Sequence, residues 1–164
     1  MIDKNGHIKL IDFGFSKQLN SIYKDKAYTN CGTPGYCAPE VMLDHGYTYK
    51  ADIWSIGIMI CEMLGGFTPF QNKNEASNPK IIMEKCRSGN LNLPKNLSGN
   101  SRDLIKLLIT DDYNSRLDIQ QIKEHKFFRN IDWNQLKNRK IKPPYVPEIE
   151  SGNVSEMNDS IITK

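Results

Sequence analysis

The segment from Tyr49 to Gly65 constrains the fold of this chain more than any other part of the sequence. Its apolar residues would cover most of the circumference of a helix, and the main interruptions are Asp52, Ser55 and Glu62. A helix that is apolar all round is buried in a core, whereas a surface helix keeps a polar face. A membrane-spanning helix needs about 20 mostly apolar residues, more than this segment offers. The sequence therefore predicts a mainly α-helical domain around one buried helix, with no membrane span.

Three later segments carry the signals of shorter helices. Asn78, followed by proline, suits the start of a helix, and Gly89 suits its end. Asp118 and Gln121 have the spacing of a capping box, so another helix is predicted to follow Asp118. Ser101 is predicted to cap the helix that carries the apolar residues between 104 and 109. Together these segments predict helices that pack against residues 49–65.

The first forty residues combine a hairpin signal with a long loop. Asn5-Gly6 lies between alternating apolar residues, which predicts a β-hairpin with strands at 1–3 and 7–11. Residues 12–40 contain few periodic apolar positions and many turn-forming residues. Connections in compact domains usually have about 4–6 residues, and much longer ones are functional or disordered. Because a buried helix follows soon after this loop, we predict that the loop is functional.

Composition and charge argue against several classes of protein. The chain has 164 residues, of which 38% are hydrophobic and 25% charged, as expected for one globular domain or a large piece of one. Lys and Arg number 22 against 19 Asp and Glu, so neither nucleic acid nor a membrane surface is predicted as a partner. The four cysteines form no Cys-x-x-Cys pair, which argues against a zinc site or a disulfide framework. No signal-peptide pattern opens the chain, so we expect a cytoplasmic protein with reduced thiols.

Two triplets at the ends of the long loop carry the functional signal. Asp12-Phe13-Gly14 follows the predicted hairpin, and Ala38-Pro39-Glu40 ends the loop shortly before the buried helix. Either triplet alone recurs by chance. Their order and context match the signatures of protein kinases, in which a phosphorylation site lies between the two triplets.

Four motifs extend this match along the chain: Asp12-Phe13-Gly14-Phe15-Ser16-Lys17, Cys31-Gly32-Thr33-Pro34, Ala51-Asp52-Ile53-Trp54-Ser55-Ile56-Gly57 and Asn138-Arg139-Lys140-Ile141-Lys142-Pro143-Pro144. The sequence resembles the AGC group of serine/threonine protein kinases, and most closely the cyclic-nucleotide-dependent (cGMP- or cAMP-dependent) kinases. The resemblance implies the large, C-terminal lobe of the kinase fold, with a short β-hairpin, an activation loop and a helical bundle around one buried helix. Residues 1–128 would be part of the kinase domain. Residues 129–164 would be an AGC-type C-terminal extension, with its last ~15 residues disordered.

The resemblance assigns Asp12, Phe13 and Gly14 to the binding of Mg²⁺ and ATP. A Mg²⁺ ion that bridges two phosphates prefers carboxylate oxygen, which Asp12 would supply. Phe13 would be an apolar plug whose packing sets the position of the loop. Gly14 permits backbone angles that a β-carbon would resist.

Other residues of the loop and of the helix after it match functional positions of the family. Thr29 matches the activation-loop phosphorylation site, with Lys17 as a cationic partner of the phosphate; the alternative is an unmodified surface threonine. Thr33 matches the residue that hydrogen-bonds the catalytic loop of serine/threonine kinases, and with Pro34 it would support substrate binding. Glu62 matches a carboxylate that receives a basic substrate side chain. The alternative for Glu62 is a glutamate with a local structural partner.

Three residues match structural positions of the family. Glu40 and Arg116 correspond to a buried ion pair that joins the end of the loop to a later helix. Asp52 corresponds to a residue that accepts hydrogen bonds from the backbone of the catalytic loop.

Several parts of a kinase are missing from these 164 residues. The sequence contains no glycine-rich phosphate loop, no strand lysine for ATP, and no His-Arg-Asp catalytic loop with its asparagine. By family the parent reaction would transfer the γ-phosphate of Mg-ATP to Ser or Thr of proteins with nearby basic residues. We expect the chain alone to be inactive, to bind Mg²⁺ and ATP very weakly, and to expose apolar surface that the missing parts normally cover.

Two interpretations remain open at this point. The chain is either part of a kinase that needs its small lobe, with regulatory cyclic-nucleotide-binding domains as further partners, or a non-catalytic decoy that binds kinase partners or substrates. The sequence upstream of the Met1 codon would distinguish them.

Overall fold

The computed structural model describes residues 1–19, 25–70 and 76–148. It divides into two compact units, one formed by residues 15–131 and the other by residues 1–14 together with the segment from residue 132 on. Each unit is described by itself. The predicted disorder at the end of the chain concerns residues 149–164, which lie outside the described residues.

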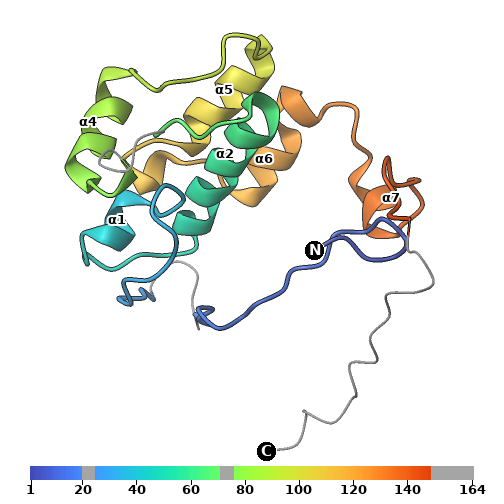
Figure 1. Cartoon of the computed structure of the whole chain (residues 1–164), viewed down its shortest axis with the longest axis horizontal. Helices are drawn as coiled ribbons and strands as arrows, with labels where there is room; N and C mark the ends of the chain where they lie inside the picture. The colour runs from blue at the N-terminus through green and yellow to red at the C-terminus, as the bar shows by residue number, and fades with distance from the viewer. Residues whose placement is uncertain (20–24, 71–75, 149–164) are drawn as a thin grey trace, which may run out of the picture. The chain divides into compact units, whose positions relative to one another are not determined.

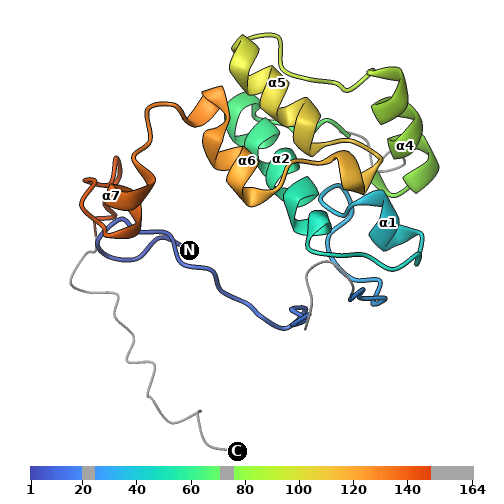
Figure 2. The same cartoon turned by 180° about the vertical axis from the view of Figure 1, so that it is seen from behind.

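The larger unit is helical, as the sequence predicts. Helix α2 lies alongside α5, and α1 lies against α4 (Figures 1 and 2). The described elements of this unit are α1 (Pro39–Met42), α2 (Lys50–Gly65), α4 (Pro79–Ser88), α5 (Gly99–Leu108), the 3₁₀ helix η1 (Tyr113–Ser115), α6 (Ile119–Glu124) and the 3₁₀ helix η2 (Lys126–Phe128). None of the described helices has the length and apolarity that crossing a bilayer requires.

Helix α2 is the centre of the core, but it is not buried all round. Trp54 and Ile58 are fully buried, and the Trp54 ring stacks on Phe70 with centroids 5.9 Å apart. On another side of the helix, Met59 is 45% exposed and Met63 is 70% exposed. The prediction of a central helix is therefore confirmed, while the prediction of complete burial is wrong on the side of these two methionines.

The helix starts show which local signals decide the boundaries. Asn78 Oδ1 accepts hydrogen bonds from the backbone of α4, and Asp118 and Gln121 form the predicted capping box at α6. Helix α5 differs from its prediction, because Ser98 and not Ser101 is its cap. Ser98 Oγ accepts a hydrogen bond from the Ser101 amide at 3.1 Å, and Ser101 itself is buried inside the first turn. Either serine has the chemistry of a cap, and the structure selects the one that lets the helix begin at Gly99.

The smaller unit contains the predicted hairpin as a turn, without the two predicted strands. The Asp3 amide donates to the His7 carbonyl at 2.8 Å, and the bridge between Ile2 and Ile8 is isolated. Ile8 and Leu10 are 82% and 85% exposed, so their apolar side chains gain little from a strand conformation. A lone two-stranded hairpin is marginal in water, which explains why pairing does not extend to residue 11.

One helix of the smaller unit has no counterpart in the sequence analysis. It is α7 (Trp133–Lys137), and the Asp132 side chain accepts hydrogen bonds from two amides of its first turn. Five residues are too few for a periodic apolar pattern, so only the cap could have indicated this helix.

Two helical glycines test the packing around α2 and α5. A Cβ on Gly65 would lie 1.9 Å from Pro94 Cγ, whereas nothing lies within 4 Å of a Cβ on Gly99. We expect Gly65→Ala to lower the free energy of unfolding by about 1–3 kcal/mol through overpacking. Gly99→Ala should leave it unchanged or raise it by up to about 1 kcal/mol through helix propensity. Urea unfolding followed by circular dichroism measures both, and equal effects would contradict this packing.

Candidate functional site

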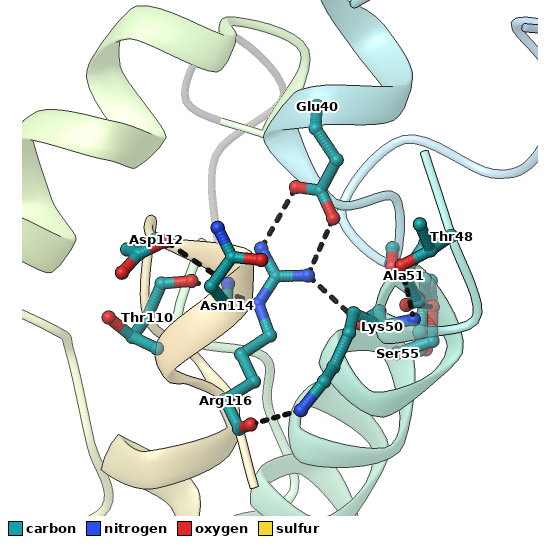
Figure 3. A network of polar contacts seen from close by, with 10 residues as sticks. Glu40, Thr48, Lys50, Ala51, Ser55, Thr110, Asp112, Asn114 and Arg116 are labelled. Atoms are coloured by element: carbon teal, nitrogen blue, oxygen red, sulfur yellow. Dashed lines mark hydrogen bonds and ion pairs between the residues drawn. The ribbon is translucent and has the colours of Figure 1, made fainter. Parts of the chain in front are cut away.

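A buried ion pair fixes the end of the long loop to the helical core. Arg116 Nη1 donates to Glu40 Oε1 at 2.6 Å, and Arg116 Nη2 donates to Glu40 Oε2 at 2.9 Å (Figure 3). The side chains are 0% exposed for Arg116 and 8% exposed for Glu40. Two parallel bonds between a guanidinium and a carboxylate give a strong, directional contact. The structure thus brings together two residues that lie 76 positions apart in the sequence.

The remaining donors of Arg116 extend this contact to two further segments. Its Nη1 also donates to the Lys50 carbonyl at 2.9 Å, and its Nε donates to the Thr110 carbonyl at 3.0 Å. The guanidinium carbon lies 4.9 Å from the centroid of the Trp54 ring, within the range of a cation–π contact. Lys50 Nζ in turn donates to the Arg116 carbonyl, and burial lowers the pKa of the Lys50 ammonium. One side chain therefore joins α1, the start of α2 and the segment before α6.

The described part of the loop is held to the start of α2 by backbone contacts. The Ala27 amide donates to the Tyr47 carbonyl at 2.8 Å, and the Tyr47 amide donates to the Ala27 carbonyl at 2.9 Å. Tyr47 Oη donates to the Thr29 carbonyl at 2.9 Å, and Ser55 Oγ donates to the Tyr36 carbonyl at 2.9 Å. These contacts fix the backbone on both sides of residues 30–35.

A pocket of about 310 Å³ lies between this loop and α2, and Thr33 and Asp52 both line it. Thr33 is exposed, and among the described residues no group donates a hydrogen bond to the Asp52 carboxylate. Desolvation raises the pKa of Asp52 above its ordinary value. The pocket is therefore lined by a carboxylate that has no donor in the described part of the chain and by a threonine hydroxyl.

Glu62 has the local partner that the alternative interpretation requires. Tyr36 Oη donates to Glu62 Oε2 at 2.6 Å, and this bond raises the pKa of the tyrosine. The other carboxylate oxygen of Glu62 has no such bond within the described part of the chain. Tyr36 is a partner that the sequence analysis missed, because two residues 26 positions apart leave no local signal.

Lys17, Thr29 and Pro34 are not joined to one another. Thr29 and Pro34 are exposed, and no hydrogen bond or ion pair links Lys17 to Thr29 within the described residues. Lys17 instead lines a second pocket of about 350 Å³, which it shares with Tyr47 and Asp52. The pairing of Lys17 with a phosphate on Thr29 stays a prediction.

Asp12, Phe13 and Gly14 belong to the smaller unit. Asp12 has a positive φ of 60°, and its Oδ1 accepts a hydrogen bond from the Gly14 amide at 3.3 Å. Phe13 is 66% exposed, and its role as an apolar plug stays a prediction.

These residues do not make a complete site for Mg²⁺ and ATP. Mg²⁺ takes octahedral oxygen coordination. The exposed Asp12 carboxylate can offer oxygen ligands, but the described residues contain no group of three or more His, Cys, Asp or Glu suited to hold a metal. We therefore derive no chemical step through Mg²⁺ or ATP from this chain.

The buried ion pair gives a first prediction. Glu40→Gln leaves a buried guanidinium without its counter-charge, so we expect the free energy of unfolding to fall by about 3–5 kcal/mol. The control is Asp111→Asn, which breaks the Asp111–Arg87 pair, in which the Arg87 side chain is 65% exposed. Asp111 is 17% exposed, but its partner lies mostly in solvent, so this pair should contribute at most about 1 kcal/mol. Adding Arg116→Met to Glu40→Gln should recover part of the loss, and similar losses in Glu40→Gln and Asp111→Asn would contradict the assignment.

Asp52 gives a prediction on pH dependence. Desolvation raises its pKa in the folded state above the ordinary 3.8, so the folded chain binds this proton more tightly than the unfolded chain. The associated stability is present at low pH and is lost as the pH rises from 3.8 through the folded pKa. Asp52→Asn removes this dependence, so the variant should gain stability relative to the parent over that range. Urea unfolding at a series of pH values measures the difference, and a change of the opposite sign would contradict the desolvation of this carboxylate.

Comparisons with known proteins show which family the sequence matches. A model of the protein kinase domain matches residues 1–128. The chain is 42% identical over 154 residues to the human cAMP-dependent protein kinase catalytic subunit PRKX, with 91% of this chain and 41% of the relative covered. It is 40% identical to serine/threonine-protein kinase gad8 of Schizosaccharomyces pombe, with 99% and 28% covered. It is also 40% identical to human ribosomal protein S6 kinase alpha-3, with 90% and 20% covered.

The chain spans less than half the length of each of these curated relatives. The family model nevertheless matches most of its residues, and the mainly helical fold agrees with the large lobe of that family. The chain therefore belongs to the protein kinase domain family, alongside serine/threonine kinases of the AGC type.

Proposed function

We propose that this chain is the large-lobe part of a serine/threonine kinase that transfers the γ-phosphate of Mg-ATP to protein hydroxyls. The observation that carries the proposal is the bidentate Glu40–Arg116 pair, which fixes the end of a loop that begins at the Asp12-Phe13-Gly14 motif. Phosphoryl transfer depends mainly on positioning and charge stabilisation, so a firmly held loop is what this chemistry requires. In this proposal, residues 1–128 are part of the kinase domain and residues 129–164 are the C-terminal extension.

The pocket between the loop and α2 is the proposed position of the catalytic loop. Asp52 faces it with a carboxylate that no described residue hydrogen-bonds, and desolvation makes its charged form unfavourable. Backbone amides from an inserted segment would donate to this acceptor, because hydrogen bonds to the charged form offset the desolvation of a carboxylate. Thr33 lines the same pocket and would hydrogen-bond that segment, with Pro34 beside it contributing to substrate binding.

The proposed regulation uses the exposed residues Thr29 and Lys17, and the proposed substrate preference uses the half-buried Glu62. A phosphate on Thr29 would add about −1.5 to −2 charges and pair with nearby cations, of which Lys17 is our candidate. Glu62 would receive a basic side chain near the target serine or threonine, and its free carboxylate oxygen supports this role alongside Tyr36. Relatives named as cAMP-dependent protein kinase catalytic subunits support dependence on a cyclic nucleotide, which we propose is exerted through separate regulatory domains.

These 164 residues are proposed to be inactive on their own. They contain no glycine-rich loop, ATP lysine or His-Arg-Asp sequence, and Asp12 is the one expected Mg²⁺ ligand. ATP and Mg²⁺ should therefore bind very weakly. Catalysis would require a small lobe and a catalytic loop as partners.

A specific observation favours the decoy function as a second candidate. Met59 and Met63 of α2, with Leu107 of α5, are large apolar side chains left 36–70% exposed. Exposed apolar surface of this kind favours binding to another protein. Under the first proposal this surface is covered within the complete kinase, and under the second it binds a partner directly.

Sequencing of full-length transcripts, followed by assay of their product, separates the two proposals. The kinase proposal expects an in-frame His-Arg-Asp segment upstream of the Met1 codon. The product should phosphorylate a serine peptide flanked by arginines, Asp12→Asn should abolish the transfer, and Thr29→Ala should weaken it. Asp111→Asn, at the ion pair with the exposed Arg87, is the control and should retain activity. An in-frame stop upstream, with no transfer by the 164-residue chain, would reject the kinase proposal in favour of the decoy.

A further inference from the structure

Two free cysteines of the loop lie close together on the wall of one pocket. Cys37 Sγ donates a weak hydrogen bond to the Cys31 carbonyl at 3.6 Å, and both residues line the 310 Å³ pocket beside Thr33. Both side chains are half-buried and reach the solvent through this pocket. Small oxidants can therefore reach either thiol.

The backbone between the two cysteines folds back on itself. The Tyr36 amide donates to the Thr33 carbonyl at 3.1 Å, which closes a turn and brings Cys37 beside residues 31 and 32. Gly32 permits this approach, because a Cβ at its position would lie 2.7 Å from Cys37 Sγ. The φ of Gly32 is +119°, which a residue with a side chain rarely adopts. The sequence thus contains a glycine where the Cys37 sulfur needs room.

The other two cysteines have different surroundings. Cys61 is fully buried in α2, and burial raises the pKa of its thiol to about 11. Burial likewise raises the pKa of Cys86 to about 12. The thiolate is the reactive form, so both residues should resist oxidation in the folded chain. They serve as internal controls.

We propose that Cys31 and Cys37 form an intramolecular disulfide when the protein meets a hydroperoxide. The Cys31 thiolate attacks the peroxide, giving a sulfenic acid and releasing water or an alcohol. The Cys37 thiol, as its thiolate, then displaces hydroxide from that sulfur, so the S–S bond forms and a second water is released. The peroxide is reduced by two electrons, and the two thiols supply them.

The order of these two steps follows from the position of Cys37. Burial raises the pKa of its thiol, which disfavours Cys37 as the residue that reacts first with peroxide. A disulfide needs Cβ atoms about 3.5–4.5 Å apart, so the proposal requires rotation of both side chains and movement of the turn to reach that range. Thiol-reducing systems reverse the bond, as is usual for cytosolic disulfides that act as sensors.

The consequence for activity rests on the proposed function. The bond closes a ring over residues 31–37, which includes Thr33 and Pro34, the residues proposed to support the catalytic loop and the substrate. A ring in this place would shift Thr33 away from the pocket that it lines, so oxidation should lower phosphoryl transfer in the complete kinase. Formation of the bond itself does not depend on any activity.

The test uses the purified, reduced 164-residue chain and hydrogen peroxide. After treatment, free thiols are alkylated under native conditions, the chain is digested, and the peptides are identified by mass spectrometry. We expect a peptide linked between Cys31 and Cys37, lighter by two hydrogen atoms than its reduced form and restored by dithiothreitol. Cys61 should be alkylated only after unfolding, and Cys86 should remain a reduced thiol.

Two variants assign the steps, and circular dichroism checks that each keeps its helices. Cys37→Ser should stop at a Cys31 sulfenic acid that dimedone traps, and Cys31→Ser should give no internal bond. Separate overoxidation of the two cysteines, bonds between molecules, or thiols that stay fully alkylatable would each overturn the proposal. None of these results bears on the kinase assignment, which the transcript and transfer assays test independently.

Discussion

The contact between Arg116 and Glu40 is the interaction on which the rest of this structure depends. Glu40 lies in the short helix that ends the long loop, and Arg116 lies beyond α5, so the pair closes a contact between parts of the chain that have no local connection. All three nitrogen atoms of the guanidinium donate hydrogen bonds, toward Glu40, the Lys50 carbonyl and the Thr110 carbonyl, while its face lies on Trp54. A buried charge with all of these partners is tolerated, and a buried charge without them is not. The loop is therefore fixed at its end even though Thr29 and Thr33 remain exposed.

The fold could be predicted from the sequence where the signal is local. The apolar segment at α2, the Asn78 cap and the Asp118 capping box each involve residues within a few positions of one another, and each is present. The failures have physical reasons. Two serines three residues apart have the same capping chemistry, so Ser98 could not be distinguished from Ser101. An apolar alternation around Asn5-Gly6 indicates strands, but strands need a layer to cover them, and the exposure of Leu10 shows that this part of the chain has none.

The candidate site was harder to predict from the sequence than the fold, because its residues lie far apart along the chain. The order of two triplets identified the loop, and the family resemblance implied the Glu40–Arg116 pair; nothing in residue spacing alone would have joined positions 76 apart. The bond from Tyr36 to Glu62 and the closeness of Cys37 to Cys31 were not foreseen. The second depends on the turn at residues 33–36 and on the missing side chain of Gly32, and neither follows from a cysteine count.

Arg116 connects the stability of the fold to the proposed phosphoryl transfer, because it holds the end of the loop. If Arg116 holds the end of the loop, weakening its two bonds should loosen the loop before it loosens the core. Hydrogen–deuterium exchange of Arg116→Lys tests this most directly, because lysine keeps the charge and cannot form the bidentate contact. We predict faster exchange at the amides of residues 36–43, with the amides of α5 between Leu104 and Leu108 unchanged. Equal acceleration in both segments, or none in residues 36–43, would contradict the claim that this pair fixes the loop.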